Sequence, residues 1–378
     1  MDFHQFSTEK QNFKSKKMSL INKVFKKNEI QIKSYDDFWN WFQQNEKDFY
    51  KVVKKHKDIE KGFFDKLSPK LDQLRDGFFY LTGMLNSDTA ELIITADGVL
   101  KNYVFVEELI DSAPKIPGWK FTAHKPAANE GFSVNMADYE FNSQNINFYS
   151  NDDPDYPDEI DLTVVYDNYE EENKATVTNG VYIYLDNLLG ELESLTTIDS
   201  ITITGRESDQ NLIPIEKLKH YLIWRQKEFV EKYDGIRYDT DDDVCSVLKA
   251  ELNSGKKLIA SINTDLLKWD RKSSHPWIFT VTIKYDGEDN DGMPDDETYK
   301  LLDEFEDRLF AELKDYEGYL HIGRQTADSE REIYLACKDF RKPSKVTSQI
   351  MESYSGRVEI DYDIYIDKYW KSFDRFNL

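Results

Sequence analysis

The order of hydrophobic periods in the C-terminal part of the chain restricts the fold more than any other feature of the sequence. Several segments there alternate apolar and polar side chains and are rich in β-branched and aromatic residues, the pattern of half-buried β-strands. They are PWIFTVTIKYDG (276–287), GYLHIGRQT (318–326), REIYLACKD (331–339) and RVEIDYDIYI (357–366).

Helical spacing separates these strands. Residues 296–316 place apolar side chains three to four positions apart, on one face of a helix that Asp295 or Asp296 caps. This apolar stripe consists of Leu302, Phe305, Leu309 and Leu313. A second, short helix starts near Pro343 and ends at Gly356. The order β-α-β-β-α-β predicts a ferredoxin-like module, an antiparallel sheet with both helices on one face.

The first part of the chain changes period less regularly. Residues 35–85 show helical spacing throughout, with two helices expected before Gly77. Residues 91–98 (ELIITADG) predict a strand that ends in an Asp-Gly turn, and residues 103–113 predict a helix. A short strand is expected within GWKFTAHKP (118–126), followed by irregular structure to about residue 158.

Residues 160–233 predict a hairpin and then helices. IDLTVVYD (160–167) and ATVTNGVYIYL (175–185) are β-rich and flank an acidic turn, so we expect them to pair. Asp186 is the expected N-cap of a short helix, and SITIT (200–204) is an expected strand. Pro214 opens a long helix whose apolar positions include Leu218, Leu222, Phe229 and Val230. A further short strand, KLIASI, precedes the C-terminal module.

These segments together predict an α+β protein of two modules, each with an antiparallel sheet and helices on one face. We expect an N-terminal α+β module at residues 35–212, a long helix and connecting segment at 213–276, and the ferredoxin-like module at 277–378. Residues 1–34 form a basic leader that we expect to be flexible.

The leader contains a second candidate start, Met18, so residues 1–17 are expected to be dispensable. Residues 19–27 (SLINKVFKK) could form a short amphipathic helix that rests on a membrane surface or a partner. At this length such a helix is marginal alone, which favours a flexible leader.

Charge is unevenly distributed. Residues 1–70 hold 16 Lys, no Arg and 10 acidic residues, which gives them a net charge of +6. Because the whole chain has a net charge of −23, residues 71–378 carry −29. Since nucleic-acid binding depends on Lys and Arg that neutralise phosphates, we expect no nucleic-acid partner. A basic protein is the partner that this acidity favours, while solubility alone is the simpler explanation.

The sequence lacks a signal peptide and any apolar run long enough for a transmembrane segment, so a cytoplasmic protein is expected. Cys245 and Cys337 lie far apart and outside any metal-binding spacing. We expect both to be ordinary buried thiols in a reducing compartment.

No recognisable catalytic motif occurs, and we assign no catalytic, cofactor-binding or metal-binding residues. The acidic loop 286–297 departs from the EF-hand pattern at both ends, which favours a solvated loop before a helix. Arg324 and Arg331 could bind an anion, but are expected to offset the acids of the adjoining turn: Asp328, Glu330 and Glu332. Asp361 and Asp363 should share one face of a strand, as acid/base pairs do, although such pairs are common in this chain.

The histidines are scattered and none has a partner at metal-ligand spacing. They are His4, His56, His124, His220, His275 and His321. Each is expected to be a surface residue or a core residue with satisfied hydrogen bonds.

Several segments carry a family resemblance: FWNWF, ELIITADG, Ala113 to Trp119, and SVLKAELNSGKKL through HPWIFTVTIKYDG. In these the chain resembles the bacterial family catalogued as domain of unknown function 695, over most of residues 35–378. The tail, from CKDFRKPSKV to DYDIYIDKYWKSFDRF, is also similar to the type B regulator of ribonuclease E activity. The first resemblance implies an α+β intracellular protein, and the second implies one that binds an enzyme and changes its activity.

We therefore expect a non-enzymatic binding or regulatory protein that acts on a protein partner. The alternative is an enzyme whose site lies in a cleft between the modules and is built from carboxylates, Arg and Tyr.

Overall fold

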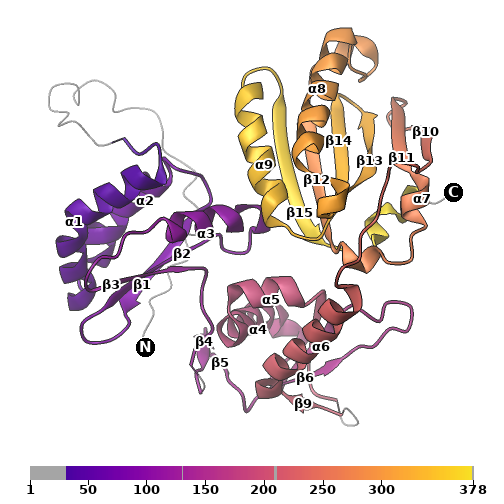
Figure 1. Cartoon of the computed structure of the whole chain (residues 1–378). Helices are drawn as coiled ribbons and strands as arrows, with labels where there is room; N and C mark the ends of the chain where they lie inside the picture. The colour runs from indigo at the N-terminus through magenta and orange to yellow at the C-terminus, as the bar shows by residue number, and fades with distance from the viewer. Residues whose placement is uncertain (1–30, 130, 208–210, 377–378) are drawn as a thin grey trace. The chain divides into compact units, whose positions relative to one another are not determined.

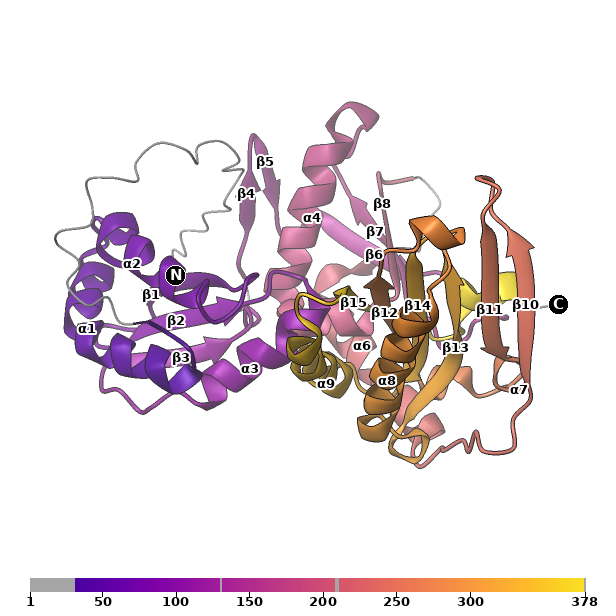
Figure 2. The same cartoon turned by 90° about the horizontal axis from the view of Figure 1, so that it is seen from above.

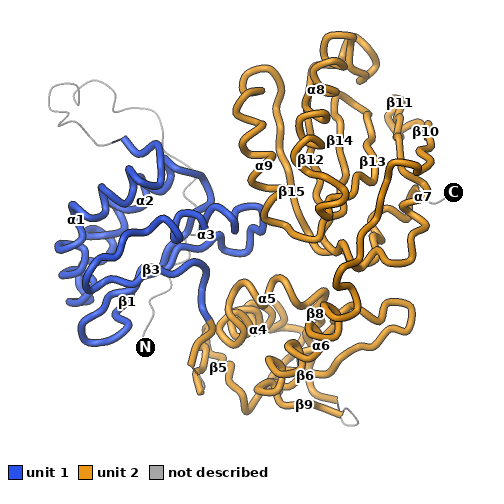
Figure 3. The backbone as a smooth tube through the Cα atoms, in the orientation of Figure 1, with its two compact units in different colours: residues 1–126 blue, residues 127–378 orange. Residues whose placement is uncertain are grey.

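The computed structural model describes residues 31–129, 131–207 and 211–376. Its contacts divide the chain after Pro126 into two compact units, unit 1 and unit 2 (Figure 3). The expectations for Met18 and for residues 1–30 of the leader lie outside the described residues. At the end of the leader, Ile32 is buried and its N donates to Gln73 Oε1 at 2.8 Å, and Ser34 caps α1. The ranges 35–212, 213–276 and 277–378 stay a prediction about which segments fold independently.

Unit 1 is a three-stranded sheet covered by helices (Figure 1). Strand β2 pairs antiparallel with β1 and parallel with β3. An aromatic core joins α1 to the sheet, with the Phe42 ring in edge contact with Trp119 at 5.1 Å and Phe121 at 5.3 Å. The elements are α1 (Tyr35–Lys55), η1 (Glu60–Phe64), α2 (Asp65–Leu71), β1 (Phe79–Met84), β2 (Ala90–Thr95), η2 (Leu100–Asn102), α3 (Tyr103–Asp111) and β3 (Trp119–Ala123).

The prediction that residues 35–85 are entirely helical is wrong at their end, where β1 lies. Gly77 lies in the turn after α2 and has a φ of 86°, a backbone conformation that residues with a Cβ rarely adopt. The following residues then pair along β2 from Phe79 to Met84. Apolar spacing in so short a segment fits a helix or a strand, and the ladder to β2 decides between them.

The first part of unit 2 is a four-stranded sheet in the order β8-β7-β6-β9, with a separate two-stranded ribbon, β4–β5. Side chains of β6, β7, α4 and α6 meet in one hydrophobic core. The elements are β4 (Val134–Met136), β5 (Tyr139–Phe141), β6 (Ile146–Ser150), β7 (Asp161–Tyr166), η3 (Glu171–Asn173), α4 (Lys174–Leu189), α5 (Glu191–Thr197), β8 (Ser200–Thr204), β9 (Ile213–Pro214), η4 (Ile215–Lys217) and α6 (Leu218–Tyr233).

The predicted hairpin between 160–167 and 175–185 is wrong, because residues 175–185 lie in helix α4. The helix buries Val177, Val181, Tyr184 and Leu185, which share one helical face. Asp186 consequently lies inside α4, and Gly190, with φ of 86°, separates α4 from α5. The β-branched composition of the segment is therefore overridden by burial of this face.

The second part of unit 2 is a six-stranded sheet in the order β10-β11-β13-β14-β12-β15, antiparallel throughout. Helices α8 and α9 lie on one face (Figures 1 and 2). The elements are β10 (Cys245–Glu251), β11 (Lys257–Asn263), α7 (Thr264–Leu267), η5 (Lys272–Ser274), β12 (Trp277–Lys284), η6 (Glu288–Asn290), α8 (Asp296–Glu312), η7 (Asp315–Glu317), β13 (Tyr319–Ala327), β14 (Glu330–Cys337), α9 (Arg341–Met351), η8 (Glu352–Tyr354), β15 (Glu359–Ile366) and η9 (Lys371–Phe376).

The predicted α+β class and the β-α-β-β-α-β order are confirmed. Strands β13-β14-β12-β15 form the expected four-stranded antiparallel sheet, and the predicted α8 stripe is buried: Leu302, Phe305, Leu309 and Leu313. Two features extend the prediction. Strand β10, which the sequence analysis does not predict, pairs with β11 and widens the sheet. The tail residues Trp370, Phe373 and Phe376 pack on the face of the sheet opposite the helices.

Candidate functional site

A pocket of about 610 Å³ lies in unit 2, where β6 and β9 meet helix α6. Its volume falls within the range of roughly 300–1,000 Å³ that ligand-binding pockets occupy. The lining residues are Tyr149, Ser150, Asp152, Asn211, Ile213, Tyr221, Trp224 and Arg225. Aromatic rings thus supply much of the wall, beside one carboxylate and one guanidinium.

Hydrogen bonds hold the polar side of the pocket in place. The Tyr221 hydroxyl lies 2.7 Å from Ser150 Oγ, which joins α6 to the end of β6. Ser150 Oγ also donates to Asp152 Oδ1 at 3.1 Å. The start of the loop after β6 is therefore oriented before any ligand arrives.

Arg225 fastens the rest of that loop to α6. Its Nη2 donates to the carbonyl oxygens of Pro157 at 2.7 Å and Glu159 at 3.0 Å, and its Nη1 donates to the Tyr221 hydroxyl at 3.0 Å. The guanidinium also lies 3.8 Å from Asp152 Oδ1, and the Arg225 side chain is only 13% exposed. Its charge is therefore engaged within the protein.

Helix α6 carries apolar side chains on two faces. Leu218 and Leu222, two of the apolar positions named from the sequence, are buried in the core. Ile223, Trp224 and Val230 are instead 59%, 53% and 54% exposed, so the apolar position Val230 lies outside the core. Of these three, Trp224 lines the pocket, and exposed large apolar side chains are typical of interaction sites.

The loop that borders the pocket is acidic. Asp152, Asp153 and Asp155 are exposed, and the Asp152 side chain is 83% accessible. An incoming ligand therefore meets the Asp152 carboxylate together with the aromatic rings of the wall.

The same loop ends in a network around Asp158. The Asp158 carboxylate accepts hydrogen bonds from Lys232 Nζ at 2.8 and 2.9 Å, from the Tyr233 hydroxyl at 2.7 Å and from the Tyr369 hydroxyl at 2.8 Å. Lys368 Nζ donates to the Asp158 carbonyl oxygen at 2.9 Å. The loop thus links α6 to the segment that follows β15.

Further ion pairs continue this link. Lys368 Nζ lies 2.6 Å from Asp199 Oδ2, with both side chains nearly buried, and Lys371 Nζ lies 2.7 Å from Glu159. Burial raises the pKa of Asp158, but the bonds from Lys232, Tyr233 and Tyr369 outweigh it and hold that pKa below its usual range. For Asp199, burial wins over Lys368 and raises the pKa.

Comparison with known proteins gives one family match. Residues 249–377 match a family of unknown function, DUF695. No curated protein and no solved structure matches the chain. The comparisons give no support to the resemblance of the tail to the ribonuclease E regulator.

The DUF695 match covers the six-stranded sheet from within β10 to η9. Lys368, Tyr369 and Lys371 lie inside the matched range, whereas the pocket residues precede it. The Asp158 network therefore joins the segment that matches the family to the part of unit 2 that holds the pocket.

Arg324 and Arg331 lie under helix α8, not over the adjoining turn. Arg331 is 2% exposed and donates to Glu306 Oε1 at 2.9 Å and to Asp303 Oδ1 at 3.2 Å, while Arg324 pairs with Glu306 Oε2. The prediction that these arginines offset the acids of the turn is wrong. The pleat of β13 and β14 turns both side chains toward α8.

The sequence held a signal for this pairing. Glu306 follows Leu302 by four positions and precedes Leu309 by three, so it belongs to the buried face of α8. A carboxylate there requires a cation from the sheet. Burial raises the pKa of Glu306 despite both arginines.

The histidines of the described residues lie apart from one another in separate settings. His56 and His220 are exposed, and His124 stacks on Tyr103 with ring centroids 4.2 Å apart. His275 is buried beside Ser274 Oγ at 2.9 Å, and burial lowers its pKa to about 3. Burial lowers the pKa of His321 to about 4, and its ring contacts Phe310.

Cys337 is buried as predicted, but Cys245 is exposed, because β10 is an edge strand. Asp361 and Asp363 share the exposed face of β15, as the alternation predicts. Asp295 caps α8 by accepting from Thr298 N at 2.8 Å, which confirms one of the two predicted caps.

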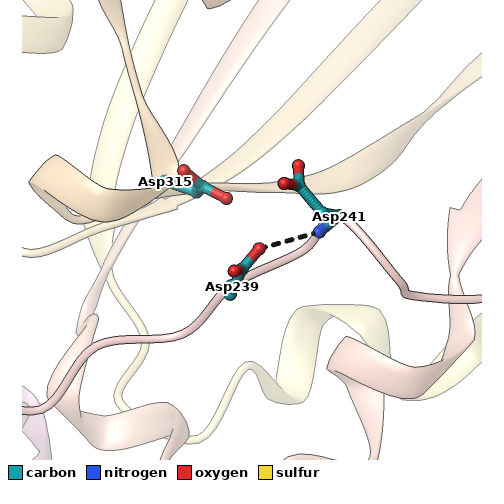
Figure 4. Close-up of side chains that lie close together, drawn as sticks. All are labelled: Asp239, Asp241 and Asp315. Atoms are coloured by element: carbon teal, nitrogen blue, oxygen red, sulfur yellow. Dashed lines mark hydrogen bonds between the residues drawn. The ribbon is translucent and has the colours of Figure 1, made fainter.

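Within the described ranges, one group of carboxylates lies close enough together to bind a cation: Asp239, Asp241 and Asp315 (Figure 4). Their oxygens lie within 4.8 Å of one another. Asp239 accepts from Asp241 N at 3.0 Å, and Asp315 accepts from Thr240 N and Oγ1 at 3.2 and 3.1 Å. The carboxylates therefore already fasten this loop to η7.

Sequence reasoning missed the pocket because its residues come from separate segments that only the sheet brings together. Trp224 alone offered a signal, since it lies off the apolar stripe of its helix. Among the described residues, no helix combines the length and apolarity needed to span a membrane.

Proposed function

We propose that the protein works by binding, and that a basic protein partner docks on unit 2 around the pocket and the outer face of α6. The observation that carries this proposal is Trp224, which is 53% exposed at the wall of a preformed pocket. Exposing a large indole to water is unfavourable, and a partner that covers it recovers that free energy. Trp is also among the residues most enriched where partner binding is strongest.

The extent of the surface supports a macromolecular partner. Ile223 and Val230, seven positions apart on α6, share a second exposed side of the helix, roughly 100° around its axis from Trp224. A pocket that serves a small molecule alone does not require apolar side chains along the adjoining helix. Apolar anchors around a pocket are the usual arrangement at protein interfaces.

Charge supports a basic partner. Residues 71–378 carry −29, exposed Asp152 lines the pocket, and exposed Asp153 and Asp155 follow it in the same loop. Complementary charge accelerates association and discriminates against acidic partners and nucleic acids.

Affinity capture with the full chain tests the proposal. Wild type and Trp224→Ala are compared at low and high salt, with Tyr316→Ala as the control, because Tyr316 is also exposed, at 66%, but lies in η7. We expect a basic protein that wild type and Tyr316→Ala retain, that Trp224→Ala loses, and that high salt releases.

Two results would contradict the proposal. One is capture that does not change with Trp224→Ala. The other is tight binding of RNA or DNA in a gel-shift assay, which would overturn the charge argument.

A further inference from the structure

We infer that the pocket receives a Lys or Arg side chain of the partner, between the Trp224 and Tyr149 rings and the carboxylate of Asp152. This inference deepens the proposed function and rests on it. It concerns which chemical group the pocket recognises, whereas the proposed function concerns where the partner docks.

The wall of the pocket suits a cation. Aromatic faces attract cations through the negative potential above the ring, and Trp attracts them best. The Tyr221 and Trp224 ring centroids lie 6.0 Å apart at 58°, so the two rings are splayed rather than stacked on each other. Tyr221 already has the Arg225 guanidinium 5.9 Å from its centroid, which leaves Trp224 and Tyr149 as the aromatic side chains for a ligand.

The balance of charge at the pocket also favours a cation. Asp152 is 83% exposed, whereas the Arg225 side chain is 13% exposed and bonded to Tyr221 and two backbone carbonyls. Arg225 also lines the pocket, but its charge is engaged by these partners, so Asp152 presents the more exposed charge to a ligand. Asp153 and Asp155 add negative charge on the same loop.

The hydrogen-bond geometry keeps Asp152 available. Its Oδ1 accepts from Ser150 Oγ at 3.1 Å and lies 3.8 Å from Arg225. Both contacts that involve Asp152 use Oδ1, and the side chain remains 83% exposed at the pocket. A long, flexible Lys or Arg side chain can lay its methylene groups on Ile213 and the rings while its charge reaches Asp152.

The test uses a short glycine–arginine repeat peptide, its lysine counterpart, and its citrulline counterpart, which has the same shape without the charge. Binding to the full chain is measured by calorimetry. We expect the arginine and lysine peptides to bind and the citrulline peptide to bind at least several-fold more weakly. Trp224→Ala should weaken arginine-peptide binding by roughly 2- to 30-fold, the range expected for loss of a cation–π contact.

Asp152→Asn should weaken the same binding by roughly two- to five-fold, because it removes an exposed charge but keeps the shape. Tyr316→Ala and Asp289→Asn are the controls, since they alter an exposed aromatic residue and an exposed Asp in the other part of unit 2. Both controls should bind the peptides as wild type does.

Three results would overturn the inference. The citrulline peptide could bind as tightly as the arginine peptide, or Trp224→Ala could leave arginine-peptide binding unchanged. Alternatively, N-acetylargininamide alone could match the peptide, which would make this a small-molecule cation site. If partner capture depends on Trp224 while citrulline and arginine bind equally, docking stands and cation recognition fails. If the arginine peptide binds in a Trp224-dependent way but no partner protein is captured, cation recognition stands and the docking of a basic protein fails.

Discussion

The Asp158 carboxylate accepts hydrogen bonds from side chains that stand far apart in the sequence, on α6 and after β15. Hydrogen bonds to a charged group contribute roughly 1.5–3 kcal/mol. We therefore expect Asp158→Asn, which keeps the shape and removes the charge, to lower the free energy of unfolding by about 1–3 kcal/mol. Urea denaturation measures this, and Asp153→Asn on the exposed part of the same loop is the control, with little or no change expected.

The pH dependence of stability follows from the same carboxylate. The pKa of Asp158 is lower in the folded protein than in the unfolded chain, so its contribution is fully present above the unfolded pKa of about 4. It is lost as the pH falls through the lower, folded value. The stability difference between wild type and Asp158→Asn should accordingly shrink below about pH 4. A difference that grows on acidification would show that another group controls the network.

Glu306 allows a sharper test of a buried pair. Arg331 is 2% and Glu306 6% exposed, and removing one partner of a buried pair costs about 3–5 kcal/mol because the other charge is left buried. Glu306→Gln should therefore lower the free energy of unfolding by roughly that amount. Asp303→Asn is the control, since Asp303 is 40% exposed and contacts the same arginines. Its loss should stay below about 1 kcal/mol, and equal losses in the two variants would contradict the buried-pair account.

Among the elements, helix α4 depends on one glycine. A Cβ at Gly180 would lie 2.1 Å from the Phe141 ring, closer than side chains pack. Ala favours helices over Gly by roughly 1 kcal/mol, but overpacking of a core costs about 1–3 kcal/mol. Gly180→Ala should therefore destabilise the protein in thermal unfolding, while Tyr182→Ala on the exposed side of α4 should change little. Stabilisation by Gly180→Ala would mean that α4 does not pack on β5.

The sequence predicts a helix or strand more securely when the segment contains more repeats of its hydrophobic pattern. The α8 stripe runs from Leu302 to Leu313 and fixes a helix, and β12 and β13 beside it are eight and nine residues long. The α4 segment has β-branched and aromatic residues that fit either period, and only its packing against β5 and β7 decides. The pocket could not be predicted, because Tyr149, Ile213 and Trp224 meet only through the pairing of β6 with β9.

At the scale of the whole molecule, the Asp158 network predicts how the melting temperature changes when unit 2 is truncated. A fragment of residues 127–378 keeps the contacts from Lys368, Tyr369 and Lys371 to the loop at 156–159. A fragment of residues 236–378 keeps the complete six-stranded sheet but loses these contacts. We expect the shorter fragment to melt at a lower temperature than the longer one. Equal melting temperatures would show that the network does not stabilise the sheet.

The most direct test of the central proposal places a photo-crosslinking residue, p-benzoylphenylalanine, at Ile223 beside Trp224, and at Tyr316 as the control. Both positions are exposed, at 59% and 66%, and Ile223 borders the proposed docking surface. Irradiation in cells should crosslink a basic protein at position 223 and not at 316, and adding Trp224→Ala should abolish that product. Crosslinks of equal yield at both positions, or crosslinks at 223 that survive Trp224→Ala, would contradict a docking surface on α6.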